Sequence, residues 1–143
     1  MRPKKVRYST ADEIETAFYD ALSRADIDAL MALWSDDDEI VCIHPNAPRL
    51  VGHASIRASW ETIFERGGVH IRPIQIHIMQ NLMTAVHNLV EEVHRAELAQ
   101  QELHILATNV YMKTPLGWRI AAHHASIAPG HAPIEPLMMS LLH

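Results

Sequence analysis

The chain of 143 residues has the length of one ordinary domain and can bury a core without disulfides or a structural metal. Its formal net charge of −5 provides no general attraction to nucleic acid, so we expect no nucleic-acid partner. No stretch approaches the roughly 20 apolar residues of a membrane span, and the basic start of the chain lacks the apolar region of a secretory leader. We therefore expect a cytoplasmic protein with no membrane partner.

The first half of the chain has the pattern of helices. Thr10 followed by Glu13 is typical of a capping box, and apolar residues recur behind it at helical spacing to about Arg24. Asp26 predicts the start of a second helix, whose apolar face continues to Trp34.

A short buried strand is predicted over residues 40–43, and the prolines that follow it interrupt regular structure. The lone Cys42 lies in this strand, where a small core residue is more typical than a reactive thiol. A third helix is predicted after Gly52, with Trp60 on its apolar face, and it stops at Gly67.

The second half of the chain changes to the alternating pattern of strands. Four segments alternate apolar and polar residues with short links between them: 74–79, 86–93, 103–111 and 118–126. Such a series predicts an antiparallel meander, and helices placed before strands predict an α+β fold. We expect a single domain over residues 9–128, with a flexible N-terminus at 1–8 and an irregular tail at 129–143.

The order of these elements resembles the nuclear transport factor 2-like superfamily, especially its SnoaL-like and ketosteroid-isomerase-like branch. The resemblance rests on segments along most of the chain, which are 18–22, 26–34, His44-Pro45 followed by Gly52, Ile56 and Trp60, and then 107–111, 117–120 and 123–126. It implies a cone-shaped fold, in which three N-terminal helices pack on a curved antiparallel β-sheet and enclose a cavity. It also implies a homodimer paired through the outer sheet face. Several strands here are apolar on both faces, which agrees with a covered outer face.

Three residues are candidates for catalysis. In steroid-isomerase-like members a carboxylate base precedes a proline at the end of the first strand, and His44 occupies that position here. Histidine can act as a general base near neutral pH, although His44 could instead cap the strand. Those isomerases also use a tyrosine of the first helix as an oxyanion donor, which the alignment places at Tyr19 or at Phe18. Tyr19 is equally compatible with the edge of the surface.

His124 is the third candidate, because it alternates with Trp118, Ile120 and Ala122 on an apolar face. We expect it to face the cavity and the adjacent His123 to face the subunit interface. The alternative is a histidine that is simply buried in the core. Asn109 or His124 would polarise a carbonyl group, since no counterpart of the family's second acidic donor is evident.

Five residues are candidates for ligand binding: Trp34, Trp60, His77, Asn109 and Trp118. The tryptophans line the cavity or fill the core, and His77 faces either the pocket or the interface. The chain has no His-Glu-x-x-His helix and no paired cysteines, so we expect no metal and no cofactor, although His44, His77 and His124 could in principle converge.

We expect a small hydrophobic or carbonyl-containing ligand and three alternative functions. The chain could be an isomerase, cyclase or dehydratase acting by proton transfer. It could instead be a ligand-binding module without catalysis, or an association domain. Whether it is an enzyme remains open at this point.

Overall fold

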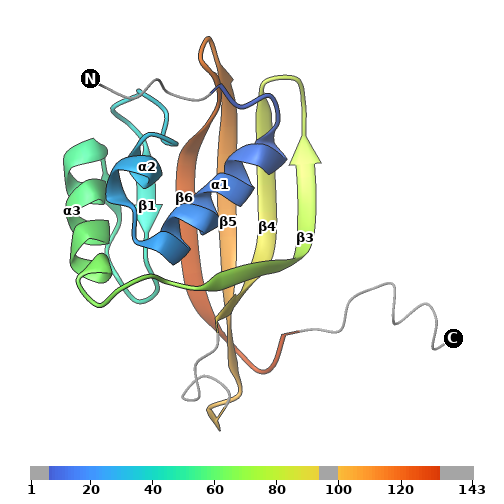
Figure 1. Cartoon of the computed structure of the whole chain (residues 1–143). Coiled ribbons are helices and arrows are strands. Elements are labelled where there is room, and N and C mark those ends of the chain that lie inside the picture. The colour runs from blue at the N-terminus through green and yellow to red at the C-terminus, as the bar shows by residue number, and fades with distance from the viewer. Residues whose placement is uncertain (1–6, 94–99, 133–143) are drawn as a thin grey trace, which may run out of the picture.

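The computed structural model describes residues 7–93 and 100–132, and it confirms the α+β class and the order of elements (Figure 1). The elements are α1 (Ala11–Arg24), α2 (Ile27–Met31), β1 (Val41–Ile43), β2 (Leu50–Val51), α3 (His53–Phe64), β3 (Ile71–Gln80), β4 (Thr84–Val93), β5 (Leu103–Thr114) and β6 (Gly117–Pro129). The second helix is shorter than predicted, because it ends before Trp34.

The first two helices begin where their capping residues stand. Thr10 Oγ1 accepts a hydrogen bond from the backbone N–H of Glu13 at 3.1 Å, and Asp26 Oδ1 accepts one from Ala29 at 3.0 Å. Each cap satisfies a backbone donor that has no partner inside its helix. Between the two helices Ala25 takes the left-handed conformation and ends α1.

Six strands form one curved sheet in the order β2-β1-β6-β5-β4-β3. Strands β3 to β6 make the predicted antiparallel meander. Strand β1 departs from the all-antiparallel expectation, because it pairs in parallel with β6, with Ile43 opposite His124. This pairing brings the end of β1, and therefore His44, beside the second half of β6.

A β-bulge interrupts the pairing of β5 with β6. Val110 pairs with Ala122 but Tyr111 pairs with Ile120, so Ala121 is an extra residue on β6. An extra residue reverses the side to which every later side chain on the strand points.

The bulge overturns the expected orientation of the two adjacent histidines. Ile120 faces the core before the bulge, and His123 and Ala125 face it afterwards, all with 3% exposure or less. His124 is exposed on the opposite side of the strand. The prediction that His124 faces the cavity and His123 the outside is therefore wrong.

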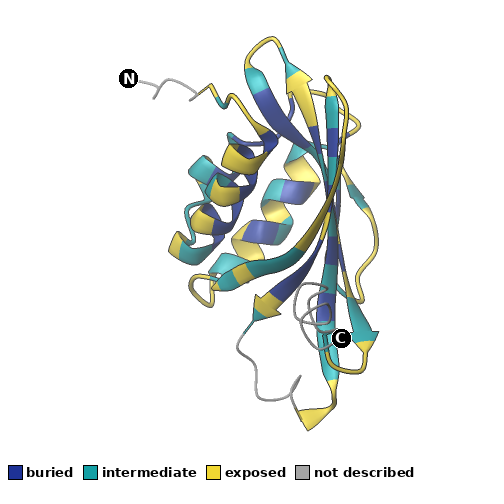
Figure 2. Cartoon of the chain, turned by 90° about the vertical axis from the view of Figure 1, so that its right-hand side faces the viewer, coloured by how far each residue is buried: buried dark blue, intermediate teal, exposed yellow. Residues whose placement is uncertain are grey.

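The helices lie on one face of the sheet, and no layer formed by the described residues covers the other face (Figure 2). The core between them is built from large apolar side chains that are fully buried, among them Phe18, Leu22, Trp34, Ile56 and Leu89. Burial of each such side chain contributes roughly 1.5–3 kcal/mol. On the part of the chain that the structure describes, no helix has the length and apolar character needed to cross a membrane.

The predicted domain limits stay predictions. Strand β6 ends at Pro129, where the irregular tail is expected to begin. Residues 1–6 of the predicted N-terminal segment and 133–143 of the predicted tail lie outside the described residues.

Candidate functional site

A pocket of about 280 Å³ lies between α3, the end of β1 and the adjoining ends of strands β3 to β6. Most of its wall is apolar and includes Trp60, Ile71, Val93, Ile105 and Ile127. Three ionisable side chains interrupt this wall, and they are His44, Glu91 and His123. A small apolar hollow with a few converging polar groups is the usual form of a small-molecule site.

His44 follows β1 and lies edge-on to Trp60, with ring centres 4.6 Å apart. Its Nε2 is 3.0 Å from Ser59 Oγ, and Ser59 donates its own hydroxyl hydrogen to the carbonyl of Ile56 at 2.7 Å. Because a serine hydroxyl has one hydrogen, Nε2–H of His44 is the donor to Ser59. Burial lowers the pKa of His44, which favours the neutral ring. Since the one proton of the neutral ring is on Nε2, Nδ1 is unprotonated.

Glu91 is a buried carboxyl group on β4, with only 5% of its surface exposed. Burial raises its pKa from the ordinary 4.5 to about 7, and the negative charge of Glu15 acts in the same direction. The hydroxyl of Tyr19 donates to Glu91 Oε2 at 2.8 Å and partly offsets this rise. Glu91 can therefore take up and release a proton near neutral pH.

A chain of hydrogen bonds behind the pocket wall joins His123 to Glu91. His123 Nδ1 is 2.6 Å from Asn109 Oδ1, and Asn109 Nδ2 donates to the Tyr19 hydroxyl oxygen at 3.0 Å. The amide oxygen only accepts, so His123 carries its proton on Nδ1. Burial lowers the pKa of His123 to about 3 and raises that of Tyr19, so the ring and the phenol both stay neutral.

Four of the residues predicted from the sequence gather at this site. His44 and Trp60 line the pocket, whereas Tyr19 and Asn109 lie behind Glu91 and His123 and position them. Tyr19 is buried rather than at the surface edge. Its phenol already donates to Glu91, so it holds a carboxyl group instead of facing a ligand.

The structure places the other four predicted residues elsewhere. His124 is exposed because of the bulge, and His77 is exposed on the edge strand β3 after an irregularity in the pairing between Ile74 and His77. Trp34 and Trp118 are buried, but they belong to the core near the start of β6. The pocket uses the other end of that strand, so a shared apolar face did not imply a shared site.

Sequence reasoning missed Glu91 and His123. Glu91 carries a usable signal, because it alternates with Leu89 and Val93 and thus places a carboxylate on an apolar face. His123 carries none, since the bulge at Ala121 lies in a run of small residues that fit a regular strand. The described residues contain no group of three or more metal-ligating side chains placed to hold an ion.

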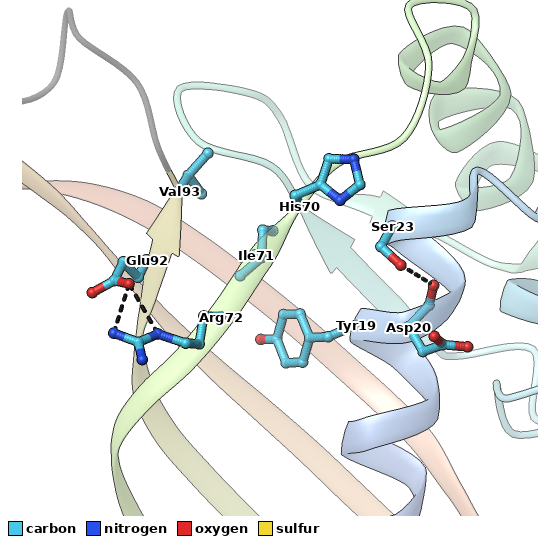
Figure 3. Close-up of a pocket in the computed structure, with 8 residues that line it drawn as sticks. All are labelled: Tyr19, Asp20, Ser23, His70, Ile71, Arg72, Glu92 and Val93. Carbon is cyan, nitrogen blue, oxygen red and sulfur yellow. Dashed lines mark hydrogen bonds and ion pairs between the residues drawn. The ribbon is translucent and has the colours of Figure 1, made fainter.

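A second, more open hollow of about 470 Å³ lies over the ring of Tyr19, between α1 and β3 (Figure 3). Arg72 stands at its side and makes an ion pair with Glu92, with Nε 2.9 Å from Oε1. Ile71 and Val93, which are paired across β3 and β4, line both this groove and the pocket. The two hollows therefore share this pair as a common wall.

Comparison with known proteins gives the chain its family. The model of the SnoaL-like domain matches residues 12–129. A provisionally assigned calcium/calmodulin-dependent protein kinase type II association domain from Thiobacillus denitrificans is 32% identical, with a TM-score of 0.71 over 89% of this chain and 99% of that one. A provisionally assigned dehydratase of the nuclear transport factor 2-like family from Streptomyces avermitilis is 26% identical, with a TM-score of 0.69 over 82% and 92%.

A ketosteroid isomerase-like protein from Erwinia carotovora atroseptica shares the fold at 20% identity, with a TM-score of 0.63 over 85% of this chain and 94% of that one. No curated protein matches the sequence. The match to the SnoaL-like model covers the helices, the sheet and every residue of the pocket. The chain therefore belongs to the SnoaL-like domain family, within the nuclear transport factor 2-like superfamily.

Proposed function

We propose that the chain is an enzyme that transfers protons on a small carbonyl compound held in the pocket, with Glu91 as the acid–base group. One observation carries this proposal, which is a buried carboxyl group with a pKa near 7 in an otherwise apolar wall. A general acid–base group works best when its pKa is close to the working pH. A buried carboxyl that served only stability would be costly to keep there.

The neighbouring residues have separate roles in this proposal. Ionised Glu91 removes a proton from the carbon next to the carbonyl group, and protonated Glu91 returns one. Tyr19 is a positioning residue, because its hydroxyl fixes the direction of the Glu91 carboxyl. His44 and His123 each present an unprotonated ring nitrogen, and His44 remains a candidate base. Glu91 is the stronger candidate, since its pKa lies nearer to neutral pH.

Isomerisation, cyclisation and dehydration of carbonyl compounds all need such a proton transfer. Dehydration fits the pocket best, because Glu91 can act first as a base and then as an acid. Ionised Glu91 takes the proton from carbon, the carbon–carbon double bond forms, and the hydroxyl leaves as water with the proton that Glu91 has taken up. The provisionally assigned dehydratase among the relatives supports this choice.

The test is turnover of a panel of β-hydroxy ketones and β,γ-unsaturated ketones by the wild type and by Glu91→Gln. Glutamine keeps the size and the acceptor for Tyr19 but cannot transfer a proton, so we expect a rate loss of about 10²-fold or more. Glu92→Gln is the matched control, because Glu92 is the next residue on β4 and does not line the pocket. Equal rates in wild type and Glu91→Gln would contradict the proposal.

The second candidate function is association without catalysis, which the relative at 32% identity favours. An apolar row crosses the outer face of five strands, and its paired members are Met79, Val86, Val110, Ala122 and Val41. We propose that a second copy of the chain covers this row in a homodimer.

Sedimentation of the wild type and of Val110→Glu tests the homodimer, because a charged glutamate in the apolar row should yield a monomer. A ring larger than a dimer, with no turnover on the panel, would favour association.

The ligand and the location are also proposals. A small hydrophobic or carbonyl-containing ligand suits the pocket, and a thermal shift with recovery of the unchanged ligand would favour binding without catalysis. The cytoplasmic location expected from the sequence stays a prediction.

A further inference from the structure

We infer that the ligand of this pocket is a neutral compound that carries a hydroxyl group, and that this hydroxyl donates a hydrogen bond to Nε2 of His123. The inference deepens the proposed function and rests on it only in treating this ligand as the substrate. The inference follows from the division of the polar atoms in the pocket wall into hydrogen-bond donors and hydrogen-bond acceptors.

His123 is the first hydrogen-bond acceptor. Its Nδ1–H is bound to Asn109, and the ring packs beside Phe18 with centres 5.1 Å apart. No other hydrogen bond of His123 occurs among the residues that the structure describes. Since the ring is neutral and Nδ1 carries its hydrogen, Nε2 has a lone pair and can only accept.

His44 is the second acceptor, and both histidine rings lie near Trp60, with centres 4.6 Å (His44) and 6.2 Å (His123) from its ring. Its Nε2–H donates to Ser59, whose own hydrogen is used on the Ile56 carbonyl. The remaining nitrogen, Nδ1, is therefore unprotonated. The two histidines hold their protons on different nitrogens, yet each has one nitrogen left that can accept a hydrogen bond from a ligand.

Glu91 completes the polar set, and its two protonation states select among ligands. No arginine or lysine is among the residues that line the pocket in the described part of the chain. A carboxylate ligand would therefore meet two acceptors and a negative group, without a cation to pair with. A hydroxyl group can donate its one hydrogen to Nε2 of His123 in either state of Glu91, and it can also accept from protonated Glu91. A group that only accepts has a donor in this wall only when Glu91 is protonated.

Three probes of similar size separate these possibilities: benzyl alcohol, benzaldehyde and benzoate. Binding is measured by NMR titration of the wild-type protein at pH 8, where Glu91 is mostly ionised and does not donate. We expect benzyl alcohol to bind roughly fivefold more tightly than benzaldehyde, the effect of one net hydrogen bond, and at least about tenfold more tightly than benzoate. Benzaldehyde or benzoate binding as tightly as the alcohol, or no binding of the alcohol, would overturn the inference.

His123→Phe removes this acceptor and keeps a ring of similar shape, so it should reduce the preference for the alcohol over the aldehyde; an unchanged preference would show that the hydroxyl does not bind His123. His124→Phe is the matched control, because His124 is exposed on the other face and should leave the preference intact. If His123→Phe does not fold, ¹⁵N NMR of the histidine rings of the wild type decides the point. A proton found on Nε2 of His123 rather than on Nδ1 would refute the assignment.

These readouts do not use turnover, so the two proposals can fail separately. A protein that prefers the alcohol but turns over no carbonyl compound would contradict the enzyme and retain the ligand class. An active enzyme that binds benzoate as tightly as the alcohol would contradict only the ligand class.

Discussion

Replacement of Glu91 by glutamine should make the protein more stable at alkaline pH, although it removes the proposed acid–base group. The pKa of Glu91 is about 7 in the folded protein and its ordinary value is 4.5. Between these values the folded protein holds a proton that the unfolded chain has already released. The free energy of unfolding of the wild type therefore falls as the pH rises through this window.

The size of the effect follows from the two pKa values. Each pH unit between them corresponds to about 1.4 kcal/mol, so ionised Glu91 costs the folded state about 3 kcal/mol at pH 8. At pH 5 the same group costs less than about 1 kcal/mol, because it is still protonated in the folded protein. Glutamine has no such cost and still accepts the hydrogen bond from Tyr19.

The measurement is urea-induced unfolding of wild type and Glu91→Gln at pH 5 and pH 8. We expect the variant to gain roughly 2–3 kcal/mol more at pH 8 than at pH 5. Glu92→Gln is the control, since Glu92 is half-exposed and its ion pair with the exposed Arg72 contributes about 1 kcal/mol or less at either pH. A stability difference between wild type and Glu91→Gln that is the same at both pH values would refute the reasoning.

Three further predictions concern the surroundings of the pocket. The pKa of His123 is lowered to about 3, so the stability that its neutral ring contributes is complete above pH 6.5 and declines as the pH falls toward 3. His123→Phe should lose less stability between pH 7 and pH 4 than wild type in urea unfolding, and an equal loss would contradict this. Glu15→Ala removes the hydrogen-bond acceptor of two buried groups, His87 Nδ1 (2.8 Å) and the Tyr111 hydroxyl (2.6 Å). The free energy of unfolding should fall by about 3 kcal/mol or more. A fall of less than about 1 kcal/mol would argue against a stabilising role for these hydrogen bonds. Ile71→Ala should open the wall between the pocket and the groove. In an NMR titration the variant should therefore bind 2-naphthalenemethanol more tightly than the wild type does. Unchanged binding would show that this wall does not limit the size of the ligand.

The sequence predicts the helices and the order of strands because local chemistry decides them. Thr10 and Asp26 cap their helices as expected, since each satisfies a backbone donor within a few residues. The positions of His44 and Trp60 were also predictable. One is fixed by a strand end before a proline, and the other by the helical period of α3.

The remainder of the site depends on long-range pairing that the sequence does not reveal. The extra residue at Ala121 is visible only in the register against β5, and it exchanges the roles of His123 and His124. The contact between Tyr19 and Glu91 joins residues 72 positions apart in the chain. Alternation along β4 could have placed Glu91 on an apolar face, but only the folded structure shows that Tyr19 of α1 holds its carboxyl group.

The most direct test of the central claim is a ¹³C NMR titration of the side-chain carboxyl groups, with the Glu91 signal assigned by its loss in Glu91→Gln. A carboxyl group that is buried in the pocket and held by Tyr19 should titrate with a midpoint near pH 7. A midpoint near the ordinary value of 4.5 would contradict the claim that this pocket contains an acid–base group suited to neutral pH.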